Sequence, residues 1–286
     1  MTRIELTIQV LTCSALVGLL AATGLRLTLK EVTQALVRCP FVTIVVVNFA
    51  VIPAVVTGIA LLFALRAEVA IGMVLLAAAP FAPVVPVFAR MARADLALAA
   101  ALTGIFPLIS AVLTPLAARA ALWVLARHSE IHFDLWSSLG LLIVTITLPL
   151  ILGVLIRHAA PQFAKQLLKP VEVISETVGA ISLAFVTVTQ FELITGLGAR
   201  AWIAMALVSE LSLVIGWRFG GPNRTGRQVV ALGTSNRNIA LALLIAVQSF
   251  SGTAIASVVA GNGLVLIALG LVHVAWWRWS GSNAST

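Results

Sequence analysis

Residues 227–249 read RQVVALGTSNRNIALALLIAVQS, an apolar stretch that is interrupted in its middle by the polar run from Gly233 to Asn238. About 20 apolar residues are enough to cross a bilayer as a helix. Polar side chains at that depth cannot face acyl chains, and an arginine at the centre of a membrane helix costs about 2.5–3.5 kcal/mol. The stretch therefore predicts a broken membrane helix whose Arg237 faces an interior partner or water.

The composition of the whole chain also favours a membrane environment. Of its 286 residues, 61% are hydrophobic and 10% are charged, which is far more apolar than a water-soluble domain of this length. The apolar segments lie near residues 5–26, 39–64, 68–90, 95–126, 135–157, 171–191, 199–217, 227–249 and 253–277. We therefore predict an all-α polytopic membrane protein with about nine transmembrane helices. It would form one integral domain over residues 1–280, followed by a disordered tail over residues 281–286.

The basic residues predict how these helices are oriented. If the N-terminus faces outward, the inward loops hold Arg26, Lys30, Arg38, Arg90, Arg93, Arg157, Lys165, Lys169, Arg218, Arg224, Arg227 and Arg278. The outward loops then hold Arg3, Arg66, Arg127 and Arg200. Because cytoplasmic loops carry an excess of Lys and Arg, we expect an outward N-terminus and a cytoplasmic C-terminus in the cell inner (plasma) membrane. The net charge of +8 then reflects topology, and no nucleic-acid partner is expected.

A second interruption lies five segments earlier in the chain. Pro80, Pro83 and Pro86 fall within the third apolar segment, and each proline removes a backbone donor and clashes with the preceding turn. In lipid, the freed backbone groups must be buried in protein or must line a watery cavity. Since the two interrupted segments run in opposite directions, we expect inverted repeats over about residues 5–126 and 135–279, with the two broken helices crossing at the bilayer midplane.

Several motifs along the chain carry a family resemblance. They are GLRLT at residues 24–28, Ala79-Pro80, Ala94-Asp95 through Pro107, Thr114-Pro115-Leu116, and GTSNRNIALA at residues 233–242. With these motifs the chain resembles the bile acid:sodium symporter family, which includes bacterial uptake proteins for organic anions. The resemblance implies that the two broken helices cross, that a panel domain flanks a core domain, and that the family's optional first helix is missing here.

The resemblance also implies where sodium would bind, and this chain differs at those positions. Family members use a glutamate and a glutamine in the second crossing helix, where this chain has Ala231 and Ser235. They use a Ser-Asn pair in the first crossing helix, where this chain has Val85 and Pro86. Few hard oxygen ligands remain for a cation. The coupling ion is therefore left open among sodium, a proton and none, no other cofactor is expected, and we hypothesise that the charge of Arg237 substitutes for sodium.

The polar residues at membrane depth are the candidates for a binding site. A guanidinium can form paired hydrogen bonds with a carboxylate or sulfonate, so Arg237 is predicted either to bind substrate or to form a structural ion pair. Glu210 is the clearest carboxylate at this depth, and it is predicted to pair with Arg237 or Arg119, to carry a coupling proton, or to lie at a different depth. The predicted substrate-binding residues are Thr234, Ser235, Asn236, Arg237, Asn238, Pro83, Thr114 and Asn262, and the ion-coupling candidates are Glu210 and Arg237.

Together these features predict a secondary transporter that moves a small organic anion by alternating access. Its expected partners are membrane lipid and the anion, and a homodimer is left open. A non-transporting membrane sensor or binding subunit with the same fold is the alternative. An enzyme is not expected, because the sequence has no HExxH motif, no Gly-x-Ser-x-Gly elbow and no phosphate-binding loop.

Overall fold

The computed structural model describes residues 2–37, 39–125 and 133–282. Every regular element within these residues is a helix, which confirms the predicted all-α class. The elements are α1 (Arg3–Arg26), α2 (Leu29–Val37), α3 (Phe41–Val46), the π-helical η1 (Val47–Val51), α4 (Ile52–Leu62), α5 (Ala67–Ala77), α6 (Val85–Met91), α7 (Leu96–Leu125), α8 (Leu135–Leu142), the π-helical η2 (Ile143–Thr147), α9 (Leu148–Ala159), α10 (Pro161–Thr189), α11 (Phe191–Thr195), α12 (Ala199–Phe219), α13 (Arg224–Ser235), α14 (Ile239–Ser249) and α15 (Ile255–Ser282).

The described helices account for the predicted membrane crossings. Eight helical stretches in the described residues are long and apolar enough to cross a membrane, and the joined pair α13–α14 is one of them. The pair α5–α6 covers the remaining predicted segment, and it fails the length criterion because it is broken in the middle. The described part of the chain therefore agrees with about nine crossings.

Two crossings contain a short π-helical segment directly before a proline. η1 is followed by Pro53 in α4, and η2 is followed by Pro149 in α9. Proline lacks an N–H and its ring clashes with the carbonyl of the preceding turn. A π turn accommodates this locally without ending the helix. Phe41–Leu62 and Leu135–Ala159 therefore each remain one candidate span.

Two features differ from the segments read in the sequence. Hydrophobic patterning does not predict α2, a short helix between the first two crossings that packs against α7. α10 begins at Pro161, well before the predicted boundary at residue 171, although Lys165, Lys169 and Pro170 are typical of a loop. Long basic side chains can extend toward water while their stems cover apolar surface, so such residues are compatible with the end of a membrane helix.

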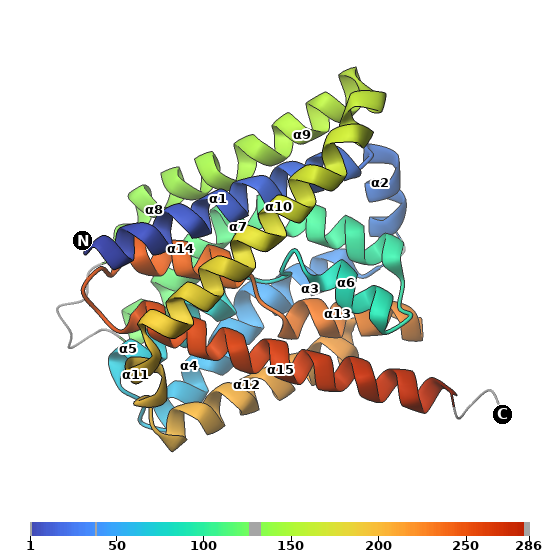
Figure 1. Ribbon diagram of the computed structural model, residues 1–286. Helices are drawn as coiled ribbons and strands as arrows, with labels where there is room; N and C mark the ends of the chain where they lie inside the picture. The colour runs from blue at the N-terminus through green and yellow to red at the C-terminus, as the bar shows by residue number, and fades with distance from the viewer. Residues whose placement is uncertain (1, 38, 126–132, 283–286) are drawn as a thin grey trace.

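The helices form two groups, which Figure 1 shows as two layers. The panel consists of α1, α8–η2–α9 and α10, in which α1 packs against both α9 and α10. The core consists of α3–η1–α4, α5–α6, α7, α12, α13–α14 and α15. α1 packs against α14, α10 packs against α15, and α8 and η2 pack against α7, so these elements form the contact between panel and core.

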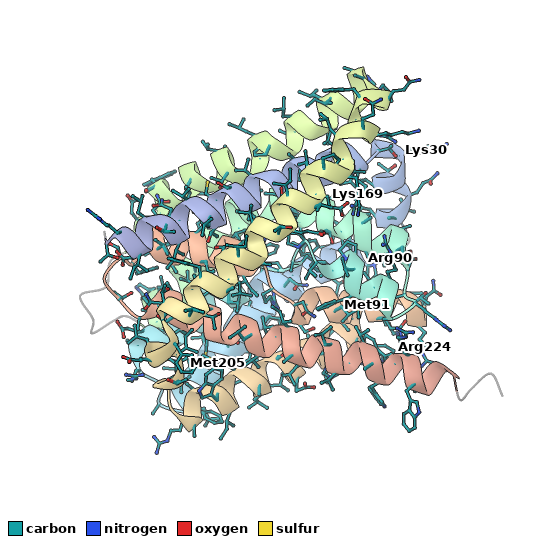
Figure 2. The ribbon with its side chains drawn as sticks, viewed as in Figure 1. Lys30, Arg90, Met91, Lys169, Met205 and Arg224 are labelled. Atoms are coloured by element: carbon teal, nitrogen blue, oxygen red, sulfur yellow. The ribbon has the colours of Figure 1, made fainter. Side chains whose placement is uncertain are left out.

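The bundle has two chemically different ends. α1 begins at one end and α15 finishes at the opposite end, as an odd number of crossings requires (Figure 1). Figure 2 shows Lys30, Lys169, Arg90 and Arg224 in the half of the molecule where α15 finishes. We call this half the C-terminal end and the other the N-terminal end. The assignment of the C-terminal end to the cytoplasmic side stays a prediction.

The predicted domain boundaries stay predictions as well. α15 continues to Ser282, into the tail predicted for residues 281–286. Residues 283–286 lie outside the described residues.

Candidate functional site

The first broken helix is interrupted between Ala77, where α5 ends, and Val85, where α6 begins. Pro80 and Pro83 lie in this break, and Pro86 lies in the first turn of α6. The buried Phe81 has a φ of 57°, in the left-handed region that a non-glycine residue rarely adopts. The prolines therefore end the helix where the sequence predicted, and the break is held in a strained, fixed conformation.

The second broken helix is interrupted at Asn236, Arg237 and Asn238, between α13 and α14. The side chain of Asn238 caps α14 by accepting a hydrogen bond from the backbone N–H of Leu241 (3.1 Å). A cap of this kind stabilises a new helix start after an irregular segment. The break therefore occupies the second half of the predicted polar run, while Gly233, Thr234 and Ser235 form the last turn of α13.

The two breaks cross and bind each other through their backbones. Three hydrogen bonds join them: Phe81 N to Gly233 O (3.1 Å), Ala82 N to Asn236 O (3.1 Å), and Asn238 N to Ala79 O (2.7 Å). In lipid, unwound backbone is tolerated only where its polar groups find partners. Each break supplies donors and acceptors for the other, so the predicted crossing is confirmed as a hydrogen-bonded unit.

Two side chains complete the backbone hydrogen bonds of the first break. The guanidinium of Arg237 donates from Nη1 to Ala77 O (2.9 Å), at the C-terminal end of α5. The hydroxyl of Thr114 on α7 donates to Ala78 O (2.7 Å). Arg237 is only 3% exposed, and its second nitrogen, Nη2, is buried without a hydrogen-bond partner among the described residues. The crossing therefore contains one buried cation with an unused donor.

A cavity of about 460 Å³ lies between the panel and the crossing. Its core wall comes from both breaks, from α6 and α14, and from Leu266 and Ile267 of α15. Its panel wall comes from α1 and α10. Apolar side chains such as Leu19, Val87 and Leu243 form most of the lining, while the polar groups gather at the crossing and on α10. A pocket that is mostly apolar with a few placed polar groups is typical of a small-molecule site.

A second, much smaller space lies on the other side of Arg237. It measures about 10 Å³ and is lined by Ser212, Ser235, Arg237 and Asn262 together with apolar side chains. The Oδ1 atom of Asn262 is buried there without a partner among the described residues. A volume of this size is close to what a single water molecule requires, so this space is no substrate site.

The structure brings only part of the predicted site together. Pro83, Asn236, Arg237 and Asn238 line the large cavity. Ser235 and Asn262 line the small space instead. Their roles in substrate binding stay predictions.

Three predicted residues lie away from the cavity lining. Thr234 is fully buried and accepts a hydrogen bond from the Asn48 side chain (3.2 Å), and Thr114 bonds the first break as described above. Glu210 pairs with His273, whose Nε2 lies 3.1 Å from its Oε2. The expected pairing of Glu210 with Arg237 or Arg119 is therefore wrong, because α12 packs against α15 and turns this carboxylate toward His273.

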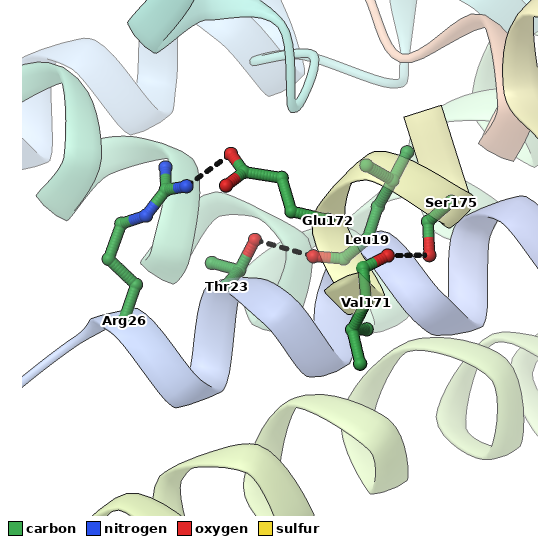
Figure 3. Close-up of polar contacts among 6 residues, drawn as sticks. All are labelled: Leu19, Thr23, Arg26, Val171, Glu172 and Ser175. Atoms are coloured by element: carbon green, nitrogen blue, oxygen red, sulfur yellow. Dashed lines mark hydrogen bonds and ion pairs between the residues drawn. The ribbon is translucent and has the colours of Figure 1, made fainter. Parts of the chain in front are cut away.

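Sequence reasoning missed the polar residues of the panel. Thr12 on α1 and Ser182 on α10 line the cavity, and their hydroxyls lie 2.7 Å apart. Glu176 on α10 also lines it. One turn closer to the C-terminal end, Glu172 pairs with Arg26 of α1 (Figure 3). A carboxylate inside the sixth apolar segment was the signal that could have identified Glu176.

Several hydrogen bonds join the panel to the core at the N-terminal end. The carboxylate of Glu5 on α1 accepts from the backbone N–H of Gly252 (2.6 Å), in the loop before α15. The others are Gln248 Nε2 to Ser137 Oγ (2.9 Å), Ser257 Oγ to Gln190 Oε1 (3.2 Å), and a contact of 3.3 Å between the hydroxyls of Ser138 and Ser249. At the C-terminal end, the ion pair between Arg26 and Glu172 joins α1 to α10 within the panel (Figure 3).

The chain matches a known family. Residues 10–197 match the model of the Sodium Bile acid symporter family. The matched range contains most of α1, the other panel helices and the first break, and it ends before α12. A search of curated proteins finds no match.

Proposed function

The chain belongs to the sodium bile acid symporter family, and from this premise we propose that it is a secondary transporter that carries a small organic anion by alternating access. The observation that carries the proposal is Arg237, a buried cation on the cavity wall with one donor unused. A buried guanidinium is stabilised by a partner of opposite charge. The described residues show no ion pair for Arg237, so a solute anion is the partner that we propose.

The start of α14 favours an anion at the same place. Ile239 and Ala240, the first residues of this helix, line the cavity. The N-terminus of a helix carries partial positive charge and favours anions. The guanidinium and this helix end lie on the same wall, so their effects on a carboxylate or sulfonate would add.

The opposite wall limits the charge of the solute. Glu176 faces the cavity from α10, and the rest of the lining is largely apolar. A second negative charge on the solute would be repelled by this carboxylate and would lack a donor in the apolar lining. We therefore propose a monoanion with an apolar body.

Sodium fits poorly at the crossing of this chain. Five backbone oxygens at the crossing already accept hydrogen bonds, namely those of Ala77, Ala78, Ala79, Gly233 and Asn236. A sodium ion would also lie close to the permanent charge of Arg237. Since like charges repel strongly where water is excluded, we propose that transport does not require sodium and that Arg237 substitutes for the ion.

The arrangement of contacts supports an inward-facing state. The hydrogen bonds between panel and core described above lie at the N-terminal end, whereas the α6 part of the cavity wall lies between the crossing and the C-terminal end. We propose that the C-terminal end faces the cytoplasm and that the cavity is open to that side. The basic residues at this end favour the same orientation (Figure 2).

Exchange in proteoliposomes tests the proposed function. Purified full-length protein would be assayed for counterflow of radiolabelled taurocholate, pantoate and an aliphatic sulfonate, in sodium and in potassium buffers. We expect exchange of at least one monoanion at equal rates in both buffers. Exchange that strictly requires sodium would overturn the proposed substitution by Arg237, and no exchange of any probe would overturn transport.

Variants of Arg237 locate the binding site. Arg237→Met removes the charge at similar length, and losing a hydrogen bond to a charged group costs about 1.5–3 kcal/mol, so we expect affinity to fall about 10- to 150-fold. Arg200→Met, an exposed arginine at the start of α12, is the matched control and should exchange normally. Sodium-dependent uptake that survives loss of Arg237 and is abolished by Asn236→Ala would refute this assignment.

The alternative function is a membrane sensor or binding subunit with the same fold. Its motivation is the loss of the sodium ligands, which a non-transporting protein would not need. A sensor would be stabilised by its ligand in a thermal-shift assay but would give no counterflow. The two assays on the same preparation therefore separate the hypotheses.

A further inference from the structure

Glu210 and His273 form a pair of titratable side chains outside the cavity. Glu210 lies on α12 and His273 on α15, and Nε2 of the histidine lies 3.1 Å from Oε2 of the glutamate. The glutamate side chain is 43% exposed and the histidine side chain is 14% exposed. The other ion pair in the described residues, between Arg26 and Glu172, lies within the panel. The pair is therefore an isolated polar contact between two core helices.

The hydrogen bonds of His273 fix how many protons the pair holds. Nδ1 of the ring lies 2.7 Å from the backbone oxygen of Leu269. A carbonyl oxygen only accepts, so Nδ1 carries a proton. A neutral imidazole with its proton on Nδ1 presents a lone pair at Nε2, which would face the lone pairs of a carboxylate. The contact with Glu210 therefore requires one more proton between the two groups.

The surroundings of Glu210 make this proton important. Ile203, Leu207 and Val214 lie on the same side of α12 and are 57%, 38% and 58% exposed, which marks the face turned toward lipid. With the extra proton the pair has no net charge, whereas without it the pair has a charge of about −1 next to acyl chains, which lipid disfavours. Membrane insertion therefore favours the proton-bound pair.

The other charged side chains near this pair do not take the place of that proton. The charged residues on helices packed against α12 or α15 are Glu68, Arg90, Lys165, Lys169, Glu172, Glu176, Glu192, Arg200, Arg218, Arg224, Arg227 and Arg278. No ion pair between any of them and Glu210 or His273 occurs in residues 2–37, 39–125 and 133–282. α3, η1, α4 and α14 carry no charged side chain. A proton is therefore the partner that neutralises the pair.

Both helices of the pair touch the second broken helix. Gly270, three residues before His273 on α15, lies so close to Asn236 that a Cβ atom there would be 2.7 Å from the amide oxygen. A Cβ atom at Gly216, on α12, would lie 2.8 Å from the Cβ atom of Thr234. Protonation that changes the contact between α12 and α15 would therefore act directly on the crossing.

From these contacts we propose that Glu210 and His273 form the proton-binding site of the transporter, and that proton release and uptake there drive the movement of the crossing. This inference rests on the proposed function for its transport step. The proton-binding step is independent of it, because it follows from the hydrogen bonds of His273.

Nuclear magnetic resonance tests proton binding without any solute. The full-length chain labelled with ¹⁵N-histidine would be placed in lipid nanodiscs near neutral pH, and loss of a signal in His273→Asn would assign the residue. We expect Nε2 to show a protonated or shared-proton signal in the wild type and an unprotonated signal in Glu210→Gln. Glu192→Gln, which removes an exposed carboxylate on α11, is the control and should match the wild type. An unprotonated Nε2 in the wild type whose signal is unchanged in Glu210→Gln would overturn the proposal, because Nε2 would then neither carry a proton nor accept one from the Glu210 carboxyl.

A pH gradient tests coupling. Proteoliposomes would be assayed for uptake of radiolabelled taurocholate and pantoate with and without a gradient of one pH unit, acid outside. One proton coupled per solute supports up to about tenfold accumulation. We expect the gradient to raise accumulation in the wild type and in Glu192→Gln, but not in Glu210→Gln or His273→Asn. An equal response in all four proteins would overturn the coupling. If no probe moves in the wild type under any condition, the proposed function fails, while the resonance measurement still decides whether the pair binds a proton.

Discussion

The close contact between Gly233 and Phe81 allows a quantitative prediction about the crossing. A Cβ atom at Gly233 would lie 2.1 Å from the ring of Phe81. The ring is fully buried and packs on Phe106 with centroids 4.1 Å apart, so it cannot swing aside. Gly233→Ala should therefore displace the first break and weaken the hydrogen bond from Phe81 N to Gly233 O. Overpacking costs about 1–3 kcal/mol and a hydrogen bond about 0.5–1.5 kcal/mol, so we expect a loss of about 2–4 kcal/mol.

The assay compares this variant with a glycine that has room. A Cβ atom at Gly140, within α8, would meet no atom within 4 Å. Gly140→Ala should be neutral or stabilise the protein by about 0.5–1 kcal/mol, because glycine is unfavourable inside a helix. In scanning fluorimetry we expect Gly233→Ala to lower the Tm by about 4–10 °C, and counterflow to be slowed in the same variant. The reasoning would be refuted if both variants had the wild-type Tm, because the breaks would then not be packed as described.

Three further predictions concern the hydrogen bonds and thiols around the site. Thr114→Val keeps the shape but leaves the oxygen of Ala78 without its donor, so stability measured by scanning fluorimetry should fall by about 1–3 kcal/mol, whereas Thr114→Ser should match the wild type. Glu5→Ala removes the carboxylate that joins α1 to the loop before α15. A cysteine placed at Ala240, on the cavity lining of a cysteine-free protein, should then react faster with a thiol reagent added from outside. An unchanged rate would show that this hydrogen bond does not help to close the N-terminal end. Burial raises the pKa of the Cys39 thiol. In a variant that lacks Cys13, iodoacetamide should therefore react more slowly with Cys39 than with a small free thiol at mildly alkaline pH. Equal rates would contradict the burial of Cys39.

The positions of the breaks could be predicted because their signals are local. Proline removes a donor wherever it occurs in a helix, and a run such as Gly233 to Asn238 is too polar for lipid at any rotation of the helix. Pro80 and Pro83 lie in the first break, and Asn236 to Asn238 form the second. The lengths of the apolar segments predict most of the membrane crossings for the same reason.

The partners of the polar residues could not be predicted, because they depend on how distant helices pack. Thr114 was expected near the solute, yet its hydroxyl bonds the backbone at Ala78. Pairing with Arg237 or Arg119 is one of the three roles that the sequence predicts for Glu210, yet the glutamate pairs with His273 on α15. Each of these polar side chains can form hydrogen bonds with several kinds of partner, and the tertiary packing determines which partner lies within reach. Whether the panel residue Glu176 faces the cavity, lipid or another helix depends in the same way on how α10 packs, so its position in the sequence does not show that it lines the cavity.

Arg237 both stabilises the crossing and lines the cavity, so a test of anion binding must separate these two roles. Arg237 donates Nη1 to Ala77 O, so its removal weakens the fold as well as the binding of an anion. Nη2 has no hydrogen-bond partner among the described residues, and it is the donor that we propose for the solute. Arg237→Lys keeps the charge but has no second planar nitrogen, so it can satisfy the carbonyl or reach the solute, but not both in the same geometry. If Arg237 binds the solute, the lysine variant should keep a near-normal Tm and lose affinity. If its role is structural, the Tm and the affinity should change together.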